Sequence, residues 1–150
     1  MIKEMSSQGL LREIKKDFFS LRNGIIADSL KKLYPSDTII FGLNVPQFMD
    51  LAKKYPKDIE LGLELWKDKK CRESRLFSLY IIPPSQLDKE KAKEMIRDVK
   101  SIEEAEFLAF KVLRNLKDAR EIYEEISKEE MKEPLSSYCV SMFKKNLLAQ

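Results

Sequence analysis

The sequence contains no histidine and only two cysteines, Cys71 and Cys139, which lie far apart in the chain. Without histidine, neither a Ser-His-Asp nor a Cys-His catalytic set can be assembled. A zinc site is not expected either, because zinc sites use closely spaced Cys and His ligands. Two distant cysteines also give no disulfide framework. We therefore expect reduced thiols, no metal site and a chemistry that does not use a histidine base.

Glycine is scarce as well, with four in 150 residues, and no glycine-rich phosphate-binding motif is present. Gly42 therefore predicts a tight turn with positive φ and not a phosphate cradle. Nothing in the pattern indicates a cofactor. No apolar run approaches the roughly 20 residues needed to cross a bilayer, and the start of the chain shows no signal segment. We expect a soluble cytoplasmic protein with no membrane partner.

Charged and helix-favouring residues are abundant. Charged residues make up 35% of the chain and hydrophobic residues 43%, which suits a helical domain with its own core. The net charge is only +3. Residues 1–34 hold seven Lys and Arg against four acids, whereas residues 101–135 hold six against ten. Any affinity for nucleic acid must therefore come from local clusters, and the acidic stretch points away from a continuous phosphate track.

Apolar residues recur at helical spacing along most of the chain. They predict helices at about residues 4–21, 25–33, 45–54, 57–68, 88–100, 101–113, 118–126 and 135–147. Leu76, Leu79 and Tyr80 mark one more helix, which Pro83-Pro84 closes. Asn44-Val45-Pro46 is typical of a helix start, and Ser101 with Glu104 forms a capping-box pattern. The helix from 101 to 113 has the clearest amphipathic pattern. Its buried side is predicted to hold Ala105, Leu108, Ala109, Val112 and Leu113.

Eight or nine short helices joined by short loops predict an all-α fold, in which antiparallel helical hairpins stack on one another. Each hairpin would bury its apolar face only against its neighbours. We expect one domain over residues 1–150. Because no strict sequence period is visible, a compact orthogonal bundle is the alternative arrangement.

Five segments are distinctive when they are read together. They are Arg22-Asn23-Gly24, Phe41-Gly42-Leu43-Asn44-Val45-Pro46, Leu65-Trp66, Arg72-Glu73-Ser74-Arg75 and the helix from Asp98 to Leu113. In this order they resemble the DNA alkylation repair family over about residues 22–125. The resemblance implies a HEAT-like α-solenoid, wound as a right-handed superhelix, with a concave basic groove for duplex DNA. In active members it implies a DNA glycosylase that releases cationic N-alkylated purines.

The resemblance also identifies a candidate catalytic residue. In the family, a Trp and an Asp lie one turn apart at the start of the helix that matches residues 101–113, and here those positions read Ile102 and Glu106. A carboxylate can stabilise the developing charge on the sugar, and an aromatic face favours a cationic base. Glu106 keeps the carboxylate on a longer side chain, and such a displacement can cost about 100-fold in rate. The chain therefore resembles a member without the full catalytic set.

Candidate nucleic-acid contacts lie just before and within the Arg72-to-Arg75 segment. Arg72 and Arg75 are one turn apart and could present two cations to a phosphate, or could pair with neighbouring carboxylates. Lys67 and Lys70 belong to a small basic cluster that could touch a DNA backbone, or could be a solvated loop. Trp66 falls on an apolar stripe, which favours a core residue over a base-stacking platform.

Two functions follow from these observations. The first is a DNA-binding member of the family, with duplex DNA as partner and Glu106 as the residue on which any base excision depends. The second is a non-enzymatic solenoid scaffold that binds another protein through its concave face. The missing aromatic residue, the small net charge and the acidic stretch motivate this alternative function.

Overall fold

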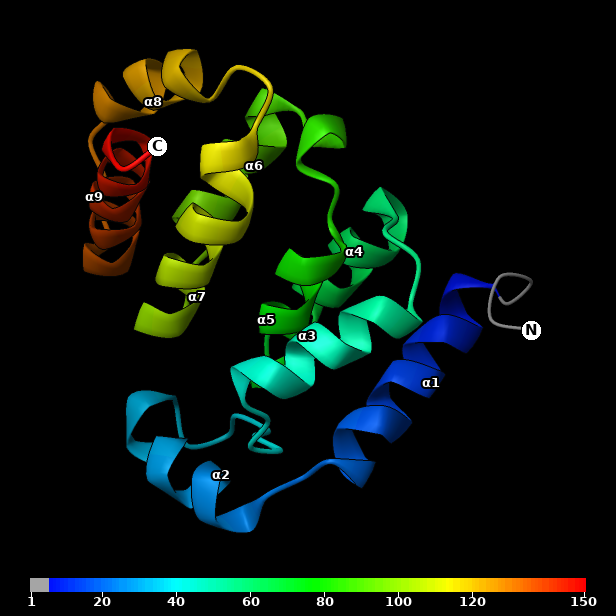
Figure 1. The fold of residues 1–150 in the computed structure, drawn as a ribbon. Helices are drawn as coiled ribbons and strands as arrows, with labels where there is room; N and C mark the ends of the chain where they lie inside the picture. Colours follow the sequence, from blue (N-terminus) through cyan, green and yellow to red (C-terminus); the bar gives the residue numbers. More distant parts are fainter. Residues whose placement is uncertain (1–5) are drawn as a thin grey trace. The chain divides into compact units, whose positions relative to one another are not determined.

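The computed structural model describes residues 6–150, and these residues form nine α-helices with no β-strand beyond one isolated bridge between Ile39 and Cys71 (Figure 1). The predicted all-α class is confirmed. The chain divides into two compact units, unit 1 (Met1–Ile82) and unit 2 (Pro83–Gln150). Within residues 6–150, no helix combines the length and the apolar character that a membrane crossing requires. One domain with a continuous superhelix stays a prediction.

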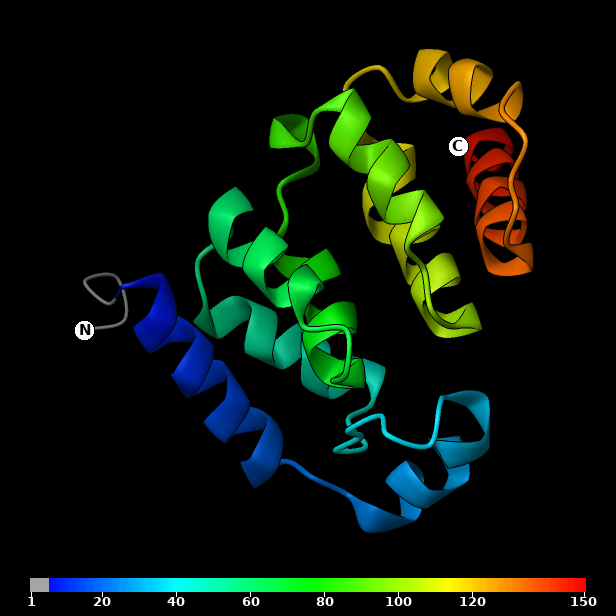
Figure 2. The ribbon, with the colours of Figure 1, turned by 180° about the vertical axis from the view of Figure 1, so that it is seen from behind.

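Unit 1 is organised around a helix that is buried along its whole length. Its helices are α1 (Ser7–Ser20), α2 (Gly24–Leu30), α3 (Val45–Lys54), α4 (Ile59–Lys67) and α5 (Arg72–Ile81). Every residue of α5 is buried. Figures 1 and 2 show α3 and α4 beside α5, and both helices contact it. The charged residues at the start of α5 therefore lie inside the unit.

Aromatic rings form the centre of this core. The ring of Phe77 on α5 lies 5.8 Å from that of Phe18 on α1 and 6.3 Å from that of Phe48 on α3. Tyr55 and Tyr80 complete the cluster, with ring centroids 6.2 and 6.3 Å from that of Phe77. Burial of large aromatic side chains is a strong contribution to the stability of a small unit.

Unit 2 contains α6 (Lys89–Arg97), α7 (Ile102–Phe107), α8 (Ala119–Ser127) and α9 (Pro134–Leu148). After Phe107, α7 continues as a π-helix (Leu108–Val112) and a 3-10 turn (Leu113–Asn115). Figures 1 and 2 show α9 beside α7, and it contacts both α7 and the π-helix. The five residues predicted on the buried side of the 101–113 helix are all completely buried, as are Cys139 and Phe143 of α9.

Cap residues account for the helix bounds that agree with the sequence prediction. Asn44 Oδ1 accepts from the Gln47 N–H at 3.0 Å, and the Gln47 side chain accepts from the Asn44 N–H at 2.9 Å, so α3 begins at Val45 as predicted. Ser101 Oγ likewise accepts from the Glu104 N–H at 3.1 Å. The predicted start of the first helix at Glu4 lies outside the described residues.

Three predicted helices differ in detail. The prediction of one regular helix over 101–113 is wrong, because regular α-helix ends at Phe107 and the π-helix follows. The helix expected over 25–33 is α-helical only as far as Leu30, and a 3-10 turn over Lys31–Leu33 follows. The helix expected over 88–100 ends at Arg97. These ends are set by local hydrogen bonding, which apolar periodicity does not report.

Candidate functional site

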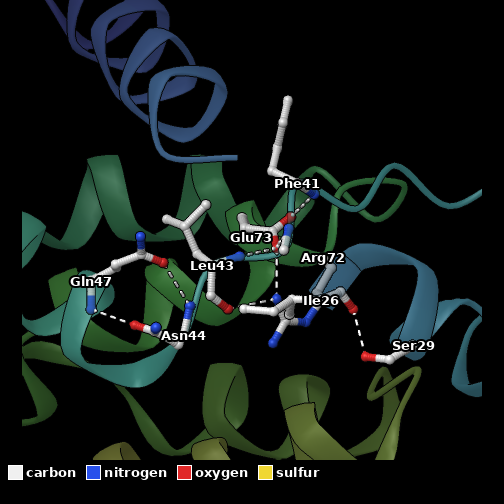
Figure 3. A network of polar contacts seen from close by, with 9 residues as sticks. Ile26, Ser29, Phe41, Leu43, Asn44, Gln47, Arg72 and Glu73 are labelled. Atoms are coloured by element: carbon white, nitrogen blue, oxygen red, sulfur yellow. Dashed lines mark hydrogen bonds and ion pairs between the residues drawn. The ribbon is translucent and has the colours of Figure 1, made fainter. Parts of the chain in front are cut away.

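Two of the distinctive segments meet at the carboxylate of Glu73, which is fully buried in α5 (Figure 3). The N–H of Phe41 donates to Oε1 at 2.9 Å, and those of Gly42 and Leu43 donate to Oε2 at 3.0 and 3.3 Å. Arg72 Nη1 donates to Glu73 Oε2 at 2.6 Å and to the Leu43 carbonyl at 3.0 Å. These bonds fix residues 41–43 against the start of α5.

The segment around Asn23 joins the same arrangement. Its N–H donates to the carbonyl of Phe41 at 2.8 Å, and its side chain caps α2. Gly42 has a φ of +93°, so the predicted positive-φ turn is confirmed. A Cβ at Gly42 would lie 2.3 Å from the Asn23 carbonyl oxygen, which only glycine avoids. We call Asn23, Gly42, Arg72 and Glu73 the loop anchor.

Arg75 points into unit 1. Its side chain is fully buried, its Nη1 donates to the Trp66 carbonyl at 2.9 Å, and its guanidinium lies 3.6 Å from the centre of the Trp66 ring. Trp66 is itself buried, so its interpretation as a core residue is confirmed. Arg72 is buried as well. A role of Arg72 and Arg75 in nucleic-acid binding stays a prediction, and their burial does not favour it.

Lys67 and Lys70, the other two predicted contacts, lie on the surface of unit 1. Lys67 pairs with Glu64 at 3.0 Å and Lys70 pairs with Asp37 at 3.4 Å. Ion pairs between exposed side chains contribute little free energy, so a phosphate could replace either carboxylate. The proposed contact of these lysines with DNA therefore stays a prediction that their exposure permits.

Glu106, the candidate catalytic residue, is exposed on α7 in unit 2. The hydroxyl of Tyr138, on α9, donates to Glu106 Oε2 at 2.6 Å. This hydrogen bond to a carboxylate favours the neutral phenol and raises the pKa of Tyr138 above its ordinary value. The same contact gives the otherwise free Glu106 side chain a defined position.

An aromatic residue and an arginine follow Glu106 along the same helix. Phe110 lies in the π-helix with 46% of its surface exposed, and the guanidinium of Arg114 lies 3.8 Å from the centre of its ring. Ile102, one turn before Glu106, is 55% exposed. π-Helical turns occur frequently at functional sites. We call Ile102, Glu106, Phe110, Arg114 and Tyr138 the α7 outer face.

Sequence reasoning missed three members of this face. Phe110 could have been found, because it lies four residues after Glu106 and outside the apolar stripe that packs into the core. Arg114 could have been found in the same way, because it follows Phe110 by four residues and also lies outside the apolar stripe. Tyr138 gave none, since it reaches Glu106 from another helix across 32 residues of sequence.

The two thiols offer no reactive group. Burial raises the pKa of the Cys139 thiol to about 12, and burial also raises that of Cys71. Both cysteines are free. Among residues 6–150, no group of three or more His, Cys, Asp and Glu side chains is arranged to hold a metal ion. We therefore take the α7 outer face, with its exposed carboxylate, aromatic ring and guanidinium, as the candidate site.

Comparison with known proteins places the chain in a family. No curated protein and no solved structure matches it. The family model described as DNA alkylation repair enzyme matches residues 14–134, which is more than half of the chain and includes the loop anchor and most of the α7 outer face. The chain therefore belongs to the DNA alkylation repair family.

Proposed function

We propose that the chain binds double-stranded DNA and that the α7 outer face contacts it. The observation that carries the proposal is the exposed Glu106 carboxylate, which Tyr138 positions on α7. The family resemblance matches this helix to the one that carries the family's catalytic residues. Phe110 and the guanidinium of Arg114 follow Glu106. They offer an aromatic ring and a cation, the groups with which proteins hold splayed bases and phosphates.

Base excision is the finer part of the proposal. Departure of a cationic N-alkylated purine leaves positive charge on the sugar, which a nearby carboxylate can stabilise. Glu106 is exposed in the free protein, so bound DNA must cover it before water stops screening its charge. Ile102 offers no π face to a cationic base. We therefore expect base release to be slow and to depend on Glu106.

Fluorescence anisotropy with a labelled DNA duplex tests the binding. Affinity should fall steeply between about 50 and about 200 mM salt, because each neutralised phosphate releases counterions. Phe110→Ala should weaken binding by roughly fivefold or more, the effect of losing one stacked base. Leu148→Ala, which shortens another exposed apolar side chain of unit 2, is the matched control and should change nothing. A flat salt dependence would contradict the proposal.

Base release is tested on a duplex that contains one N7-methylguanine, by cleaving the abasic product with alkali. Glu106→Gln should abolish any release while leaving the melting temperature unchanged, because the side chain is exposed. Glu121→Gln removes an exposed carboxylate on α8 and should leave release unchanged. Equal rates for the protein and its Glu106→Gln variant would exclude Glu106 as the catalytic group.

The acidic stretch, which favoured a protein-binding scaffold, is partly neutralised within unit 2. Glu125 on α8 pairs with Lys89 at 3.1 Å and with Lys93 at 3.5 Å, both on α6. Glu129 pairs with Lys93 at 3.4 Å and with Arg97. These ion pairs join α8 and the residues that follow it to α6, so the two carboxylates add little net negative charge to the surface.

One feature of the α7 outer face also supports a scaffold role. Ile102 and Phe110 are exposed apolar side chains on the same helix, and exposed apolar side chains that lie together can anchor a partner protein. The anisotropy titration separates the two functions. Absence of duplex binding at low salt would favour the scaffold, whereas salt-dependent binding that Phe110→Ala weakens would favour DNA.

A further inference from the structure

Helix α1 has a basic side that the described residues of unit 1 leave exposed. Its apolar side chains at Leu10, Ile14 and Phe18 are buried. Arg12, Lys16 and Phe19 recur every three or four residues on a different side of the helix, so they lie along one face. They contribute to a shallow hollow that is lined by Gln8, Leu11, Arg12, Lys15, Lys16, Phe19 and Ser20.

Of the two acidic residues of α1, Asp17 is paired outside this face and Glu13 reaches one of its lysines. Asp17 accepts from Lys54 Nζ at 2.9 Å and from the hydroxyl of Tyr55. Its negative charge is therefore paired with a lysine at the end of α3. Glu13 reaches Lys16 at 3.4 Å, but that ion pair is exposed and therefore weak. The positive charge of the face is not cancelled by its own helix.

The end of the face carries an arginine stacked on an exposed aromatic ring. The guanidinium of Arg22 lies 3.9 Å from the centre of the Phe19 ring, and its Nη1 donates to the Phe19 carbonyl at 2.8 Å. Phe19 is 55% exposed. An arginine held in this way loses less side-chain freedom when it binds a phosphate, because its planar group is already oriented.

We propose that Arg12, Lys16, Phe19 and Arg22, the α1 basic face, bind the sugar-phosphate backbone of duplex DNA. The identity of the ligand rests on the proposed function, but the inference assigns a second contact surface, which belongs to unit 1, whereas the α7 outer face belongs to unit 2. At 1.5 Å per residue, Arg12 and Phe19 are about 10 Å apart along the axis of α1, and Arg22 follows just beyond the end of the helix. A duplex carries one charge per about 1.7 Å of its length, so several phosphates face a surface of this size.

A membrane surface suits this face less well. A helix that lies in a lipid headgroup layer needs a broad apolar side to insert, together with basic residues at its edges. The apolar side of α1 is already buried in unit 1, and Phe19 is the one large apolar side chain of α1 that is strongly exposed in the described structure. Charge complementarity therefore favours the phosphates of nucleic acid.

The test variant is Arg12→Gln/Lys16→Gln/Arg22→Gln, titrated by anisotropy against a labelled duplex at several salt concentrations. Loss of three phosphate contacts should weaken binding by roughly tenfold or more at low salt. It should also reduce the slope of log affinity against log salt by about 3, close to 0.9 for each phosphate. The far-ultraviolet circular dichroism should not change, because all three side chains are exposed.

The matched control is Lys31→Gln/Lys53→Gln/Lys57→Gln, which removes the same charge from other exposed positions of unit 1. It should weaken binding by less than about threefold, as expected for a general charge effect outside the contact surface. Equal weakening by the two triple variants would overturn the inference, because only net charge would then matter.

Three further outcomes are decisive. If the protein binds DNA and the Phe110→Ala variant loses that binding while the α1 variant keeps it, the α1 inference fails and the proposed function stands. If the protein does not bind DNA at any salt concentration, both fail. If vesicles of anionic phospholipid bind the protein more tightly than DNA, and the α1 variant loses only the vesicles, the face belongs to a membrane surface and the inference is overturned.

Discussion

The loop anchor makes a strong prediction about stability. Glu73→Gln keeps the shape of the side chain but replaces one acceptor oxygen by an amide donor, which then faces N–H groups. Arg72, also buried, loses its charged partner at 2.6 Å. Removing one partner of a buried ion pair costs about 3 to 5 kcal/mol. Because whole domains are stable by only about 5 to 15 kcal/mol, this single atom exchange should remove a large part of the stability.

Urea unfolding followed by the fluorescence of Trp66, the only tryptophan, measures this loss within unit 1. With a slope of about 2 kcal/mol per molar urea, the midpoint should fall by about 2 M. Glu64→Gln, which breaks the exposed pair with Lys67, is the control and should cost less than about 1 kcal/mol. If the variant is unfolded in water, a stabilising osmolyte restores a measurable transition. A loss below about 1 kcal/mol for Glu73→Gln would refute the reasoning.

Three other measurements test the described geometry. Gly42→Ala should lower the unfolding free energy by about 3 kcal/mol, because its Cβ would meet backbone atoms at 2.3 and 2.9 Å and its φ is positive; a thermal melt that is unchanged would contradict this. Cys139, whose pKa is raised to about 12, should have about one thiolate in ten thousand at pH 8 and react with Ellman's reagent only after unfolding. The pKa of Tyr138 should fall toward 10 in Glu106→Gln, followed by NMR, because the carboxylate that favours the neutral phenol is gone; an unchanged titration would mean that the hydrogen bond does not form in solution.

Much of the fold was predictable where a local rule decides it. Asn44 with Gln47, and Ser101 with Glu104, start helices through contacts between residues three apart, so the sequence alone reveals them. The buried stripe after Ser101 was predictable for the same reason. The π-helix within that stripe was not, because a π turn changes which backbone groups bond without changing which residues are apolar.

The candidate site was harder to predict because distant segments build it. Arg72 and Arg75 have a spacing that suits a surface as well as a core, and only α5, buried on every side, decides that they point inward. The backbone N–H groups that donate to Glu73 lie 30 to 32 residues before it. Glu106 could be named from the family resemblance, whereas Tyr138, which positions it, could not.

The place of the distinctive segments in the fold limits what family membership implies. The segments around Asn23, Gly42 and Glu73 meet in the loop anchor, where their hydrogen bonds and close contacts hold unit 1 together. A chain can therefore keep these segments for folding alone, whatever it does to DNA. The excision that we propose rests instead on exposed positions such as Ile102 and Glu106, whose side chains can change with little effect on the core. Membership thus predicts how this chain folds, and variants of the proposed site, the α7 outer face, are needed to test its activity.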